Sequence, residues 1–243
     1  MAGHKLITVS TAIPITSPTY WLQASDESLR HAFRSSTSEP IPLLDERISL
    51  LREAGQIMHD QFDSRPARLV EQADHSAAKL VMTLVNQFPS FRDECFWHGK
   101  TVKFYKRAQI FVADLWACFD KTGYGHFEDI DHLTIFPDYR VPQMLQSLGV
   151  LWYSPRLESR IKRQELIAPG EDHEIEIRGC SVRAVESLRR EMIRLYPEAK
   201  GQINAVLIDF FLYDTCKERE ARCMSGNGED DMLPHHRTRS IWY

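Results

Sequence analysis

The sequence predicts a mainly α-helical fold with minor β-structure, and three observations support this prediction. Several stretches repeat apolar residues every three to four positions, which is the period of one helix face. Glycine or proline marks the ends of most of these stretches. Alternating patterns typical of strands are short and rare in the 243 residues. We therefore expect helices to form the core.

Composition limits the functional classes. With 43% hydrophobic and 26% charged residues, the chain can bury a substantial core. The net charge of −4 and the pI of about 6.2 argue against direct nucleic-acid binding, which normally needs a strongly basic face. Five scattered cysteines without a CxxC pair are typical of a reduced intracellular protein. Without a membrane-length apolar run or a secretory signal, we expect a cytoplasmic protein that does not contact membranes.

The chain is expected to contain one main domain. Residues 1–40 mix Ser, Thr and Pro without a helical period, and the run SSTSEP ends them, so we predict an irregular N-terminal segment. Residues 41–243 show neither an internal repeat nor a clean linker, and we predict that they form a single helical domain.

Apolar spacing locates the expected elements. A stripe begins at Leu44, a second covers residues 80–88, and a third covers residues 108–119. Residues 88–100 are expected to form a loop with exposed aromatic side chains. A short helix ends at Gly149, HEIEIRG (residues 173–179) alternates like a strand, Ser181 is positioned to cap a helix over residues 182–195, and a last helix covers residues 202–218.

The segment FPDYRVPQ (residues 136–143) is the strongest candidate for chemistry. It places Asp138 between Phe136 and Tyr139 and beside Arg140, at the expected start of a helix. A helix N-terminus favours the ionised form of a carboxylate. Such a group can stabilise a cation or activate a water molecule.

A second carboxylate lies on the last helix. Ile203, Val206, Leu207 and Phe210 form the predicted apolar stripe, and Asp214 falls in its middle. An unpaired buried charge costs several kcal/mol, so Asp214 either forms a structural ion pair or faces a ligand pocket. Asp209 lies about 140° around the helix from Asp214.

Other polar groups allow weaker hypotheses. Lys103, Lys106 and Arg107 can bind a phosphate, although charge runs more often form a solvated helix end. Cys180 can act as a nucleophile with His173 as its base, although a lone cysteine is more often inert packing. The adjacent His235 and His236 point in different directions and lack a third ligand, so a mobile polar loop is favoured, and neither a metal nor a cofactor is expected.

Five segments together resemble the queuosine salvage family, whose members are queuosine 5′-phosphate N-glycosylase/hydrolase proteins. The similarity extends from about residue 13 to residue 243. The segments that carry it are FYKRAQIFVADLW (residues 104–116), FPDYRVPQ, EIEIRGCS (residues 174–181), INAVLIDFFLYD (residues 203–214) and the terminal HHRTRSIWY.

The resemblance implies a mainly helical fold like that of DNA glycosylases. It also implies an N-glycosidase that releases queuine from queuosine 5′-monophosphate for tRNA modification. Asp138 matches the catalytic aspartate, and it either stabilises or attacks the ribosyl cation. Phe136 is expected to stack on the base, Lys106 to contact the phosphate or ribose, and Asp209, Phe210 and Asp214 to bind queuine.

The family pattern also differs from this sequence. Members usually have about a hundred more residues at the N-terminus, which bring an aromatic NFSFW-like segment and a histidine to the base pocket. This sequence contains neither feature. The alternative function is therefore a catalytically impaired member that binds queuine or another protein.

Overall fold

The computed structural model describes residues 14–225 and 232–243, and these residues form a mainly helical fold, as predicted. The expected helices near residues 80–88 and 108–119 are confirmed as α5 and α6. The α-helices are α1 (Pro18–Gln23), α2 (Asp26–Ala32), α3 (Leu44–Phe62), α4 (Pro66–Glu71), α5 (Ala77–Gln87), α6 (Lys106–Cys118), α7 (Arg140–Ser147), α8 (Pro155–Lys162), α9 (Asp172–Leu195) and α10 (Ala205–Met224). Short 3₁₀ turns are η1 (Pro89–Phe91), η2 (Gly123–Gly125), η3 (Ile130–His132) and η4 (Pro197–Ala199).

A two-stranded hairpin lies within the region expected to be a loop. Strand β1 (Glu94–Trp97) pairs antiparallel with β2 (Lys100–Lys103). The two turn residues, His98 and Gly99, both have positive φ angles, of 45° and 79°, which suits a tight hairpin turn. The prediction of a loop over residues 88–100 was therefore wrong where these two strands form.

The part of residues 1–40 that the structure describes is less irregular than predicted, because it contains α1 and α2. Helix α1 packs against α3 at Gly55. A Cβ atom at that glycine would lie 3.0 Å from the backbone of both Pro18 and Leu22. This close approach lets the backbone of the short α1 lie directly against α3.

Residues 173–179 do not form a strand, because they belong to the first turns of α9. Ile175 and Ile177 are both buried, and so are Glu174 and Arg178, which form an ion pair four residues apart. In a helix that is buried on several faces, apolar and charged residues can alternate along the sequence without forming a strand. The prediction of a strand over residues 173–179 was therefore wrong. Ser181 lies inside the same helix, where its hydroxyl donates to the Ile177 carbonyl at 2.7 Å, and does not cap a helix.

Two apolar clusters meet along an extended segment that precedes α7. In residues 133–136 the side chains of Leu133 and Phe136 belong to one cluster, and Ile135 belongs to the other. The adjacent side chains of Ile135 and Phe136 therefore pack into different clusters. Helix α10 contacts the same two clusters, through Val206 and through Ile208. Asp138 and α10 therefore lie where the clusters meet.

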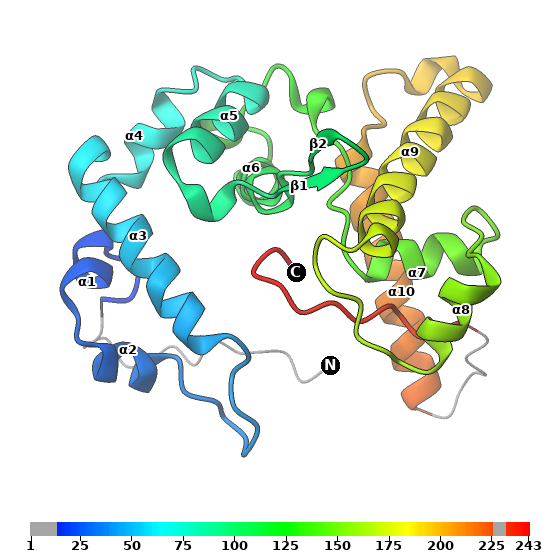
Figure 1. The fold of residues 1–243 in the computed structure, drawn as a ribbon. Coiled ribbons are helices and arrows are strands. Elements are labelled where there is room, and N and C mark those ends of the chain that lie inside the picture. The colour runs from blue at the N-terminus through cyan, green and yellow to red at the C-terminus, as the bar shows by residue number, and fades with distance from the viewer. Residues whose placement is uncertain (1–13, 226–231) are drawn as a thin grey trace.

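Figure 1 shows helices α1 to α6 on one side of the molecule and α7 to α10 on the other. The C-terminal segment, drawn in red, runs between them. A parallel bridge between Leu166 and Arg237 attaches this segment to the connection after α8. The expected short helix before Gly149 is α7, and Gly149 has a φ of 72° and donates to Gln146 O at 2.9 Å.

Asp129 stabilises the start of α5. Its carboxylate accepts hydrogen bonds from Ser76 Oγ at 2.7 Å and from the backbone N–H groups of Ala77 and Ala78. We expect Asp129→Asn to destabilise the protein by about 1–2 kcal/mol, because the charge and some of these bonds are lost at a helix N-terminus. Thermal unfolding measures this change. The exposed Asp131 offers the control Asp131→Asn, and equal melting temperatures of the two variants would contradict the assignment.

Candidate active site

Asp138 has one fixed carboxylate oxygen and one that the protein leaves available. Its Oδ1 accepts hydrogen bonds from Arg140 N at 2.8 Å and Val141 N at 3.1 Å, at the start of α7. Within the described part of the chain, no donor lies within hydrogen-bond distance of Oδ2. The side chain is half-buried. The carboxylate is therefore held in one orientation and can present an oxygen to a ligand.

Asp209 lies beside Asp138 and is buried, with 5% of its surface exposed. Its Oδ2 accepts a hydrogen bond from Phe136 N at 2.8 Å, which joins α10 to the segment that carries Asp138. Burial raises the pKa of Asp209 to about 7, and the negative charge of Asp138 acts in the same direction. The hydrogen bond from Phe136 and the charge of Lys106 oppose this rise. Near neutral pH, Asp209 is therefore present in both protonation states.

Two phenylalanines stand next to these carboxylates. Phe136 is buried and Phe210 is half-buried, and their ring centres lie 6.2 Å apart at an interplanar angle of 54°. Phe136 is also the residue whose N–H bonds to Asp209. The structure thus brings together Phe136, Asp138, Asp209 and Phe210, all of which the sequence proposed as site residues.

Lys106 is a buried cation near Asp138, with 6% of its surface exposed. Burial lowers the pKa of Lys106, while the negative charge of Asp138 is the largest effect that opposes this. Among the described residues, no acceptor forms a hydrogen bond with Lys106 Nζ. This atom is nevertheless not completely buried. The expected basic cluster is divided, because Lys103 is exposed and Arg107 faces another cavity. Lys106 alone remains available to an anion near Asp138.

The prediction for Asp214 was wrong in its geometry, because Asp214 is exposed. The buried face of α10 consists of Ala205, Val206, Ile208, Asp209, Leu212 and Cys216. Leu207, which the sequence assigned to the apolar stripe, is at the edge of exposure at 36%. The carboxylate on the buried face is thus Asp209, and a contact between Asp214 and queuine stays a prediction.

Sequence reasoning missed the role of the C-terminal aromatic residue. The Tyr243 hydroxyl donates to Glu174 Oε1 at 2.9 Å and lies 3.3 Å from His236 Nε2. Lys106 Nζ lies 5.6 Å from the centre of the Tyr243 ring. His236 is buried and burial lowers its pKa to about 3, so the expectation of a mobile polar loop was wrong for this histidine. The terminal IWY run was the available signal.

The hypothesis of a cysteine nucleophile is not supported. Cys180 is exposed and lies within α9, far from the N-terminus that would lower a thiol pKa. His173, its proposed base, lies near the start of the same helix, where its Nδ1 is 2.9 Å from Arg160 Nη1. The two side chains do not form a nucleophile–base pair.

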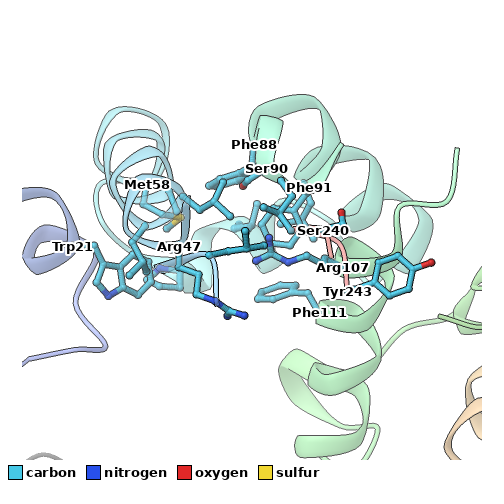
Figure 2. Close-up of a pocket in the computed structure, with 18 of the residues that line it drawn as sticks. Trp21, Arg47, Met58, Phe88, Ser90, Phe91, Arg107, Phe111, Ser240 and Tyr243 are labelled. Carbon is cyan, nitrogen blue, oxygen red and sulfur yellow. The ribbon is translucent and has the colours of Figure 1, made fainter. Parts of the chain in front are cut away.

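A cavity of about 460 Å³ lies between α3, α5, α6 and the C-terminal segment (Figure 2). Its walls are mostly apolar and aromatic, and Arg47 and Arg107 extend into it toward each other. Asp138, Phe136 and Asp209 do not line it. Tyr243 does, and this ring also lies against Lys106. The cavity therefore adjoins the carboxylate cluster at Tyr243 and does not contain it.

Residues 14–225 and 232–243 form neither a membrane-spanning helix nor a cluster of metal ligands. None of the helices there has the length and hydropathy needed to cross a bilayer. The same residues contain no group of three or more His, Cys, Asp or Glu side chains arranged to hold a metal ion.

Comparisons with known proteins identify the family. The family model described as queuosine salvage protein matches residues 7–243. A mouse protein named queuosine 5′-phosphate N-glycosylase/hydrolase is 42% identical over 236 residues, which are 95% of this chain and 67% of the mouse protein. Proteins of the same name from Schizosaccharomyces pombe and Sphaerobacter thermophilus are 40% and 38% identical, over 97% and 95% of this chain and 68% and 67% of their own lengths. The chain therefore belongs to the queuosine salvage protein family.

Proposed function

We propose that this protein hydrolyses the N-glycosidic bond of queuosine 5′-phosphate and releases queuine. Family membership supports this reaction, since the similar proteins are named for it. The observation that supports it most directly is the placement of Asp138, with one oxygen fixed by two backbone N–H groups and the other available. A carboxylate held in this way is suited to a reaction in which positive charge develops beside it.

The chemistry assigns a role to each group. When the bond between C1′ and the base breaks, the electron pair leaves with the base, and C1′ and the ring oxygen become positive. Asp138 stabilises this cation or attacks it, and the oxygen of a water molecule completes the bond to C1′. The base gains a proton. Since Asp209 exists in both protonation states near pH 7, it can donate a hydrogen bond to a heteroaromatic base or accept one.

The remaining residues hold the nucleotide. The rings of Phe136 and Phe210 provide an apolar wall next to Asp209, which suits a flat base. Lys106 has an ammonium group without an acceptor among the described residues, and it suits a phosphate or ribose oxygen. These contacts suit a nucleotide substrate. We propose that the protein acts on it in the cytoplasm and without a cofactor.

Mass spectrometry of the reaction products tests the function. We expect the purified chain to convert queuosine 5′-phosphate to free queuine and ribose 5-phosphate in equal amounts. A thermal-shift titration with queuine, run in parallel, reports binding. Stabilisation by queuine without any product would contradict the hydrolase and favour the alternative of a queuine-binding protein.

A further inference from the structure

A buried ionic group lies directly behind the candidate active site. It consists of Asp93, which immediately precedes β1, and of Glu174 and Arg178 from α9. The exposed fractions of these three residues are only 2%, 1% and 2%. Arg178 Nη1 donates to Asp93 Oδ1 at 3.1 Å and to Glu174 Oε1 at 3.2 Å, and Nη2 also bonds to Asp93. Burial lowers the pKa of Arg178, but the bonds and charge of Asp93 outweigh this and raise it.

This group contacts the segment that carries the proposed catalytic Asp138 and the segment that carries the proposed substrate-binding Lys106. Arg178 Nε donates to the Pro137 carbonyl at 3.2 Å, and Pro137 directly precedes Asp138. Asp93 Oδ2 accepts a hydrogen bond from Lys106 N at 3.2 Å. A single guanidinium–carboxylate pair therefore connects the backbone before Asp138 to the backbone of Lys106.

The geometry of Arg178 depends on its planar guanidinium. Nη1 and Nη2 form a fork on the Asp93 carboxylate, Nε donates to the Pro137 carbonyl, and the group also stacks on Phe104, with Cζ 3.9 Å from the ring centre. A lysine ammonium is a single point charge on a flexible chain and cannot keep all of these bonds at once. The Nε bond to the Pro137 carbonyl brings this ion pair into direct contact with the segment that carries Asp138.

We propose that Arg178 is a positioning residue for the reaction. Through its contacts with Pro137 and Asp93, it fixes the position of the Asp138 carboxylate relative to Lys106. This inference rests on the proposed function. Arg178 acts on the substrate only through these neighbours. Loss of its planar fork should therefore change the rate of bond cleavage more than it changes substrate binding, because a small displacement of a catalytic group is costly.

Steady-state kinetics of Arg178→Lys test the proposal. We expect kcat to decrease about 10- to 100-fold, while KM changes by less than about threefold. Asp129→Asn is the matched control, because it removes a partly buried carboxylate that caps α5 and contacts none of these residues. It should lower the melting temperature and leave kcat unchanged at an assay temperature well below melting.

The outcomes separate this inference from the proposed function. Product release by the wild-type chain with an undiminished kcat in Arg178→Lys overturns the positioning role alone. No product from the wild-type chain overturns the proposed function and the role with it. If Arg178→Lys does not fold, Asp93→Asn replaces it, because that change keeps the volume but weakens the fork. A wild-type kcat in folded Asp93→Asn likewise overturns the role.

Discussion

Replacing Asp138 by asparagine is expected to reduce queuine release about a thousandfold, a loss of about 4 kcal/mol of transition-state stabilisation. The amide is neutral and cannot balance the positive charge at C1′. Its oxygen can still accept the bonds from Arg140 N and Val141 N, so the start of α7 should remain intact. Mass spectrometry of the products measures the rate, and thermal unfolding shows whether the variant is folded.

The matched control for this experiment is Asp131→Asn, which makes the same chemical change at an exposed position seven residues earlier. It should release queuine at the wild-type rate. A folded Asp138→Asn variant with the same rate as this control would show that another group stabilises the cation.

Asp209→Asn is expected to change the pH dependence of stability. Burial raises the pKa of Asp209 in the folded protein to about 7, whereas the ordinary value is 3.8. Between these two values the folded state binds the proton more tightly, so the contribution of Asp209 to stability decreases as pH rises and becomes constant above about 7. From pH 5 to pH 8 the expected loss is about 2–3 kcal/mol. Asparagine cannot titrate and should lack this dependence.

Denaturant unfolding of both proteins at the two pH values measures this effect, because the difference between them cancels the other titrating groups. Asp214→Asn serves as the control, since Asp214 is exposed on the same helix. Parallel stability curves for wild type and Asp209→Asn would mean that Asp209 is ionised throughout this range.

Local sequence patterns predicted the helices that pack against the rest of the protein through one face only. The stripes of α5 and α6 and the stop at Gly149 follow from helix geometry and glycine conformation, and the structure contains all three. The start of α9 was misread because Glu174 and Arg178 are buried there, and their burial depends on Asp93, which is 85 residues away from Arg178 in sequence. No local pattern contains that information.

The candidate site was only partly predictable for the same reason. The FPDYRVPQ segment located Asp138, and the family resemblance added Phe136, Lys106, Asp209 and Phe210. The position of Asp209 on the buried face of α10 could not be deduced, because two apolar clusters cover that helix and the exposed Phe211 obscures the stripe. The proximity of Tyr243 to Lys106 depends on the path of the C-terminal segment, which has no repeating pattern.

The buried ionic group of Asp93, Glu174 and Arg178 influences the order in which parts of the protein fold. Its bonds join positions 85 and 69 residues apart, from Arg178 to Asp93 and from Tyr243 to Glu174. Contacts of such long range form late, since closing large loops costs chain entropy before any contact compensates for it. Refolding kinetics followed by activity should therefore lag behind those followed by helical circular dichroism.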